Sequence, residues 1–130
     1  MLSMKISKSG LDAAFVEKQR QQLISLRATL ISAADAAETE EAAIKTQRSQ
    51  DPVELEDDAQ GLDALEREGN LVARNASRLD RVNRALTKIA DGSYGLSDQS
   101  GKPIPRERLE AIPDALYTLN EERAFEKSRS

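Results

Sequence analysis

Two long stretches of helical heptad repeat, separated by a single proline, constrain what this chain can fold into. From residue 11 onward, apolar side chains alternate at intervals of three and four residues, with Gln19 and Glu40 as interruptions: Val16, Leu23, Leu26, Leu30, Ala33, Ala37 and Ile44. This spacing is typical of the seam of a coiled coil. The seam residues become small and polar after Ala33, so we expect that end to pack thinly.

A second stretch of the same kind follows Pro52. The proline disfavours helix at the residue before it and is suited to the first helical turn, so Asp51 is the expected N-cap. Gly61 and Gly69 weaken the pattern and Gly92 ends it. Its seam residues are Leu55, Leu62, Leu65, Val72, Ala76, Leu79, Val82, Leu86 and Ile89. Two seams of similar length joined by a short turn predict an antiparallel coiled-coil hairpin over residues 11–91, with its tip near 47–59.

The remaining segments are short. Residues 1–10 are expected to form a flexible N-terminal arm. After Gly92, four further glycines and prolines forbid a long helix before residue 106: Gly95, Gly101, Pro103 and Pro105. Residues 106–112 form a short amphipathic pattern stopped by Pro113, and a last helix is predicted from about Asp114. The predicted fold class is therefore all-α, with residues 92–130 forming a small C-terminal lobe.

Composition excludes several classes of function. Aromatic residues make up only 3% of the 130 residues, so a large globular core is not expected. The net charge of −4 argues against direct DNA binding, which needs many cations to neutralise phosphates. There is no apolar run of membrane-spanning length and no secretory signal pattern, so a cytoplasmic location is expected. Without histidine or cysteine, and with no enclosed carboxylate pair, we expect no enzymatic activity.

The residues after the second seam carry a specific resemblance. The segments DGSYG (91–95), GKPIP (101–105) and RLEAIP (108–113) resemble the C-terminal zinc finger of the DksA/TraR family of RNA polymerase regulators. In that family two cysteine pairs bind zinc. The matching positions of this chain hold Ser97, Ser100, Thr118 and Glu121. A structural zinc is bound by four ligands that are usually Cys or His, so the resemblance implies a finger-like lobe lacking zinc.

Such a lobe needs another source of stability. Burial of one large apolar side chain is worth roughly 1.5–3 kcal/mol, so several of them can offset a lost metal. We expect packing by Leu96, Ile104, Leu109, Ile112, Leu116, Tyr117 and Leu119. Ser97 or Ser100 can also cap the turn through local hydrogen bonds.

The resemblance also implies a role for the hairpin tip. In the family the coiled coil enters the secondary channel of RNA polymerase, and acidic tip residues act near the active site. The family pattern Asp-x-x-Asp-x-Ala is matched by Glu54, Asp57 and Ala59, with glutamate in place of the first aspartate. An alternative alignment begins at Asp51 and loses both the second aspartate and the alanine. Acids outnumber bases eight to one over residues 51–68, which also fits a simple solvated helix face.

Basic residues of the second stretch have two readings as well. Some family members bind the alarmone ppGpp where the coiled coil meets the finger, and Arg74, Arg81 and Arg108 lie where basic residues are expected. Ile112 and Glu122 replace other basic positions of that site. The alternative is that these arginines are charges flanking a coiled coil, since an anion site needs several convergent donors.

The resemblance implies a non-enzymatic, DksA-like regulator of transcription initiation and of the stringent response. It is expected to act as a monomer on RNA polymerase, with no resident cofactor and with ppGpp as a candidate effector. The alternative is a structural coiled-coil module that dimerises or docks a partner helix, which exposed Ile24 and Ile31 would favour. A third possibility is a transcript-cleavage stimulator of the Gre type. Such proteins share the hairpin and the acidic tip but lack the finger sequence.

Overall fold

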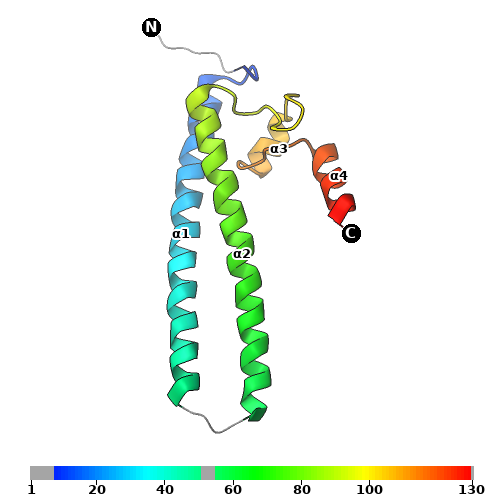
Figure 1. Ribbon diagram of the computed structural model, residues 1–130. Helices are drawn as coiled ribbons and strands as arrows, with labels where there is room; N and C mark the ends of the chain where they lie inside the picture. The colour runs from blue at the N-terminus through cyan, green and yellow to red at the C-terminus, as the bar shows by residue number, and fades with distance from the viewer. Residues whose placement is uncertain (1–7, 51–54, 130) are drawn as a thin grey trace. The chain divides into compact units, whose positions relative to one another are not determined.

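Helices make up most of the part of the chain that the structure describes. The computed structural model describes the backbone of residues 8–50 and 55–129, and the side chains of residues 8–40 and 69–128. Its helices are α1 (Ala13–Gln50), α2 (Leu55–Asp91), α3 (Arg106–Ala111) and α4 (Leu119–Arg129) (Figure 1). Helices α1 and α2 run antiparallel as a hairpin, and the described backbone contains no strand, so the all-α prediction is confirmed. None of the described helices combines the length and apolar character needed to cross a bilayer.

The chain divides into two compact units. One comprises Met1–Arg27 together with Asp80–Ser130, and the other comprises Ala28–Leu79. The N-terminal arm predicted for residues 1–10 falls largely on residues 1–7, and the predicted N-cap Asp51 falls on residues 51–54. Both segments lie outside the described residues.

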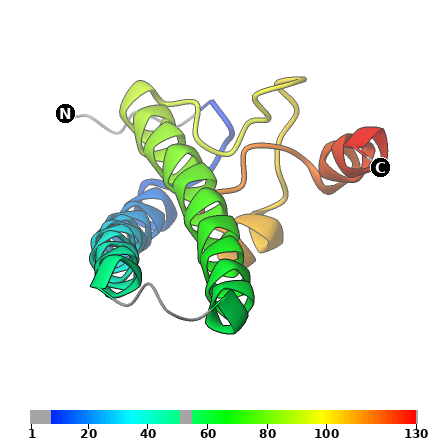
Figure 2. The same ribbon diagram turned by 60° about the horizontal axis from the view of Figure 1, so that its bottom comes forward.

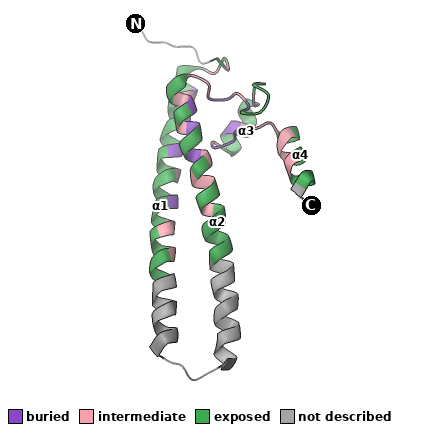
Figure 3. Ribbon diagram, viewed as in Figure 1, coloured by how far each residue is buried: buried purple, intermediate pink, exposed green. Residues whose placement is uncertain are grey.

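The unit Ala28–Leu79 packs thinly. Leu30 is the one buried residue among its described side chains, those of 28–40 and 69–79 (Figure 3). Val72, which the heptad pattern places on the seam, is exposed, and its neighbour Leu71 is 51% exposed. The physical reason is size, because the facing positions of α1 are alanines whose side chains do not reach across. A groove of about 280 Å³ remains there, lined by Leu30, Ala33, Ala34, Ala36, Ala37, Glu40, Leu71, Val72, Asn75, Ala76 and Leu79.

The other unit contains the main core. Asp12 begins α1 as its N-cap, since its Oδ1 accepts the backbone N–H of Phe15 at 2.8 Å. The first turns of α1, the last turns of α2 and the C-terminal lobe then supply the buried apolar side chains. These are Phe15, Leu23, Val82, Ala85, Tyr94, Ile104, Leu109, Ala115 and Leu116. Figure 2 shows α3 returning beside the helices after the loop that follows α2.

Gln19, an interruption of the heptad seam, is fully buried in this core. Its Nε2 donates hydrogen bonds to the hydroxyl of Tyr94 at 3.1 Å and to the carbonyl oxygen of Leu109 at 2.7 Å. Tyr94 in turn donates its hydroxyl proton to the carbonyl of Pro113 at 2.9 Å. The Gln19 Oε1 atom has no hydrogen-bond partner among the described residues. The polar seam position therefore links α1 to the C-terminal lobe.

Gly95 is required where the chain leaves the hairpin. Its φ of +92° lies in the region that side chains rarely adopt. A Cβ at this position would stand 2.7 Å from Leu11 Cδ1 and 3.0 Å from Ser9 Oγ. The glycine thus allows the backbone of the lobe to approach the segment that precedes α1.

The predicted start of the last helix at Asp114 is wrong, because α4 begins at Leu119. Asp114 is buried, and its Oδ2 accepts a hydrogen bond from Arg81 Nε at 3.4 Å. The turn that follows places Ala115 and Leu116 in the core instead of opening a helix. The packing expected from Ile112 and Leu119 is also wrong, since they are 38% and 46% exposed.

Leu23→Ala tests the position of the core. Leu23 is 0% exposed, so we expect the free energy of unfolding to fall by about 2–5 kcal/mol, as for other buried leucines. The neighbouring Ile24→Ala is the control, because Ile24 is 41% exposed and should lose less than about 1 kcal/mol. Urea denaturation followed by circular dichroism measures both. Equal losses would contradict the assigned core face of α1.

Candidate functional site

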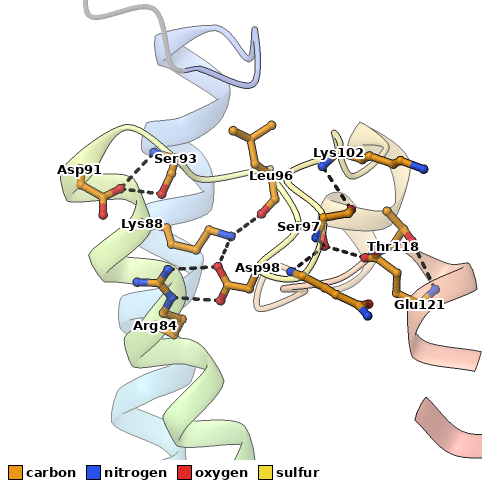
Figure 4. A network of polar contacts seen from close by, with 12 residues as sticks. Arg84, Lys88, Asp91, Ser93, Leu96, Ser97, Asp98, Lys102, Thr118 and Glu121 are labelled. Atoms are coloured by element: carbon orange, nitrogen blue, oxygen red, sulfur yellow. Dashed lines mark hydrogen bonds and ion pairs between the residues drawn. The ribbon is translucent and has the colours of Figure 1, made fainter. Parts of the chain in front are cut away.

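The lobe is anchored to α2 through one carboxylate. Asp98 accepts two hydrogen bonds from Arg84, both at 3.0 Å, and one from Lys88 at 2.9 Å (Figure 4). Lys88 is buried and also donates to the carbonyl oxygen of Leu96. The hydrogen bonds from Arg84, followed by the one from Lys88, lower the pKa of Asp98. Because both cations come from α2, Asp98 holds the loop against the end of that helix.

The loop itself is a tight reversal between Gly95 and Ile104. The N–H of Ser97 donates to Lys102 O at 2.9 Å, and the N–H of Ile104 donates to Gly95 O at 2.7 Å. Gly101, with a φ of +75°, makes the turn between them. This geometry presents Ser97 inward, where it is buried.

The structure brings Ser97, Ser100, Thr118 and Glu121 together. Ser97 Oγ donates to Glu121 Oε1 at 2.6 Å, and the N–H of Thr118 donates to the same oxygen at 2.8 Å. The N–H of Glu121 donates back to Thr118 Oγ1 at 3.3 Å. Thr118 and Glu121 therefore form a capping box at the start of α4. We call these four residues the polar quartet.

The polar quartet does not fit a structural zinc ion. Its side chains offer one carboxylate and three neutral hydroxyls, whereas such zinc sites use thiolate and imidazole ligands. The donors are also engaged with one another, since Ser97 Oγ gives its only proton to Glu121 and accepts the N–H groups of Gln99 and Ser100. Within residues 8–40 and 69–128, no group of three or more His, Cys, Asp or Glu side chains could hold a metal ion.

Charge at the quartet is concentrated on Glu121. Hydrogen bonds from the hydroxyls of Ser100 and Ser97, followed by the backbone N–H of Thr118, lower the pKa of Glu121 to about 2. The carboxylate is therefore ionised at neutral pH.

Elsewhere in the lobe, burial raises the pKa of Tyr94 to about 12, which keeps its hydroxyl protonated as the donor to the carbonyl of Pro113.

Two of the three predicted anion-binding arginines share a cavity. Arg81 and Arg108 line a hollow of about 300 Å³ together with Ile112, Asp114, Ala115, Leu119, Glu122 and Glu126. Arg81 is bonded to Asp114, and Arg108 Nε donates to the carbonyl of Tyr117 at 3.1 Å. Three carboxylates thus share the cavity with two engaged guanidinium groups, a combination that does not fit an anion by itself. Arg74 is exposed and belongs to the other unit, Ala28–Leu79.

The predicted tip residues fall where the structure describes little. Asp51 and Glu54 lie outside the described residues, and Asp57 and Ala59 lie in the described backbone of α2 with side chains that are not described. Their arrangement as an acidic tip stays a prediction.

Comparison with known proteins places this geometry in context. No family model matches the sequence. General stress protein 16O of Bacillus subtilis is 54% identical over 41 residues, which are 32% of this chain and 25% of that protein. The RNA polymerase-binding transcription factor DksA of Caulobacter vibrioides is 33% identical over 54 residues, 42% of this chain and 38% of that protein. The matches to these two relatives therefore span well under half of their length.

Longer matches cover most of the chain. An uncharacterized protein of Aquifex aeolicus is 32% identical over 103 residues, 78% of this chain and 70% of that protein. The structure of the transcription factor DksA2 from Pseudomonas aeruginosa superposes with a TM-score of 0.71 at 25% identity, covering 92% of this chain and 89% of that one. The chain belongs to the DksA/TraR family. It does so without any of the cysteines that the resemblance associates with the family's zinc finger.

Several contacts that hold the lobe were not predicted from the sequence. The contacts of Arg84 and Lys88 with Asp98 join positions ten or more residues apart in the chain and become visible only in the fold. A local signal did exist for Glu121, because Thr-x-x-Glu is the sequence pattern of a capping box. Placing the helix start at Asp114 concealed it. The sequence signal at Gln19 is misleading, because a polar residue at a seam position suggests an interruption of the repeat and not a buried core residue.

The lowered pKa of Glu121 predicts a pH dependence. Its value of about 2 in the folded chain lies below the ordinary value of 4.5, so the ionised carboxylate contributes stability above pH 4.5. That contribution is lost as the pH falls from 4.5 toward 2. Urea unfolding at several pH values measures it for the native chain and for Glu121→Gln. The stability difference between the two should shrink over this acid range, and a constant difference would contradict the assignment.

Proposed function

We propose that this chain binds RNA polymerase and regulates transcription initiation. The observation that carries the proposal is the structural match to the transcription factor DksA2, which extends over 92% of the chain. The relative from Caulobacter vibrioides, named as an RNA polymerase-binding transcription factor, adds sequence support. Polymerase acts in the cytoplasm, so the proposal places the chain there, working without direct DNA contact or catalysis of its own.

The proposed contact is the hairpin tip in the secondary channel of the enzyme. Acidic residues are concentrated at the start of the second helix, with eight acids and one base over residues 51–68. Negative charge in the first turn of a helix is favourable, whereas like charges farther along the helix repel one another, so a functional purpose for the cluster is reasonable. We propose that Asp57 is the effector residue, with Glu54, Ala59 and Asp51 shaping the tip around it.

The proposal includes ppGpp as an effector of the complex with polymerase. The cavity that holds Arg81 and Arg108 also contains Asp114, Glu122 and Glu126, whose charges oppose a highly anionic nucleotide. Additional donors must therefore come from the polymerase. Arg74 is part of the same proposal, as a basic residue of the hairpin.

A structural coiled-coil module is the second candidate, favoured by the apolar groove of the unit Ala28–Leu79. Leu71 and Val72 are exposed beside it, and Ile24 and Ile31 are exposed on α1. Sedimentation equilibrium of the full chain separates the two candidates. A monomer at micromolar concentration is the result expected for the polymerase regulator, whereas a stable dimer through the hairpin would favour the structural module.

Asp57→Asn tests the tip directly. Purified RNA polymerase of the host is incubated with each variant, and binding is measured by competition or native gel, followed by single-round transcription. We expect Asp57→Asn to bind nearly as well as the native chain but to lose its effect on initiation, because the substitution removes the charge while keeping the shape. Asp58→Asn is the matched control, with the same change of charge at the adjacent residue. It should retain most of the effect.

Two outcomes would contradict the proposal. If the native chain does not bind polymerase, the family relationship reflects ancestry alone. If Asp57→Asn and Asp58→Asn lose activity equally, bulk acidity rather than one carboxylate is responsible.

Repeating the native transcription reaction with ppGpp, and with polymerase alone as the control, tests whether ppGpp is an effector. An increased response that depends on the chain is expected.

A further inference from the structure

The polar quartet joins two segments that lie far apart in the sequence. Each contributes a pair of residues three positions apart, Ser97 with Ser100 in the loop and Thr118 with Glu121 at the start of α4. In the loop, Ser97 Oγ accepts the N–H groups of Gln99 at 3.0 Å and Ser100 at 3.2 Å. In α4, the capping box orders the first turn. Each pair thus organises its own segment.

One hydrogen bond and one charge connect the two segments. Ser97 Oγ donates to Glu121 Oε1 at 2.6 Å, a short contact of the kind that charged acceptors make (Figure 4). A donor from the loop, the hydroxyl of Ser97, and a donor at the start of α4, the N–H of Thr118, therefore converge on a single carboxylate oxygen. Ser97 is buried and Glu121 is half-buried, so the contact is partly shielded from water.

Helix α4 contributes no buried side chain to the core from its described residues. None of its described residues, 119–128, is buried, and Leu119 is 46% exposed. Its Phe125 makes an edge-to-face contact with Tyr117, which precedes the helix, with ring centroids 4.9 Å apart. The loop, in contrast, is fixed to α2 by Asp98, Arg84 and Lys88. A link from the loop to Glu121 therefore connects α4 to a well-anchored part of the lobe.

We propose that Glu121 is the anionic centre of a hydrogen-bonded cross-link that holds α4 to the loop and replaces a metal centre in this lobe. A metal ion joins two segments by drawing anionic ligands onto a central cation. Here the polarity is reversed, because a central anion draws hydroxyl and amide donors from both segments. The cross-link needs no ion from solution. It is independent of whether the hairpin binds polymerase.

Amide hydrogen exchange tests the cross-link in the full-length chain. In Glu121→Ala, we expect the amides of Gln99 and Ser100, and those of α4, to exchange about tenfold faster or more, since hydrogen bonds to a charged group are lost. Glu121→Gln should show a smaller acceleration, because an amide oxygen still accepts the capping bond. Glu126→Gln, an exposed glutamate on the same helix, is the control and should change neither segment.

The location of the change decides between roles. A residue that only caps α4 would alter the amides of that helix and of Thr118 but leave Gln99 and Ser100 unchanged. That result would overturn the cross-link. Faster exchange throughout α1 and α2 would also overturn it, since it would show a general loss of stability rather than a link between two segments.

A designed metal site tests the geometry independently. The combined variant Ser97→Cys, Ser100→Cys, Thr118→Cys and Glu121→Cys supplies two Cys-x-x-Cys pairs, a set of four thiolates suited to tetrahedral metal binding. With Co²⁺ as the probe, we expect one ion per chain, the absorption bands of a tetrahedral thiolate site, and slower exchange in α4 than in Glu121→Ala. Absence of those bands would show that the four positions do not converge on one centre. Neither experiment involves polymerase, so its result is separate from that of the proposed function.

Discussion

Asp98 lies between two cations of α2, and the C-terminal lobe depends on that arrangement. Lys88 is buried, and a buried ammonium group is tolerated only when a partner compensates its lost hydration. Asp98 and the carbonyl of Leu96 supply that compensation. Arg84 adds a two-pronged contact to the same carboxylate. Because the loop is fixed in this way, Ser97 is held in place to meet Glu121, and the polar contacts extend from α2 through the loop to α4.

Much of the fold follows from the sequence because its signals are local and periodic. The two heptad stretches specify helices directly, and Gly92 marks the end of α2 through its backbone conformation. Leu23, Leu30 and Val82 are buried as the repeat predicts. The family resemblance also depends on contiguous residues, which is why the segment from Asp91 to Pro113 was sufficient to suggest it.

The less predictable features depend on contacts between distant segments. The sequence predicts a helix start at about Asp114, but the structure uses Asp114 as a buried partner of Arg81, and α4 begins five residues later. Glu121 looks like a lost metal ligand when it is considered alone. Its role becomes apparent only when the loop brings Ser97 to it. The tip residues Asp51 and Glu54 lie outside the described part of the chain, so their role rests on the sequence and the family.

The buried amide of Gln19 has a consequence for the register of α1. A heptad seam made only of apolar residues is nearly unchanged when a helix slides by seven positions, whereas a single polar seam residue favours one alignment. If α1 slid by one heptad so that Leu26 replaced Gln19, the carbonyl of Leu109 would lose its donor inside the core. The Oε1 of Gln19, which has no hydrogen-bond partner in the described part of the chain, costs some stability. In return, only one alignment of α1 gives the carbonyl of Leu109 its hydrogen-bond donor. The position of α1 along its axis is therefore fixed relative to the segment that follows α2.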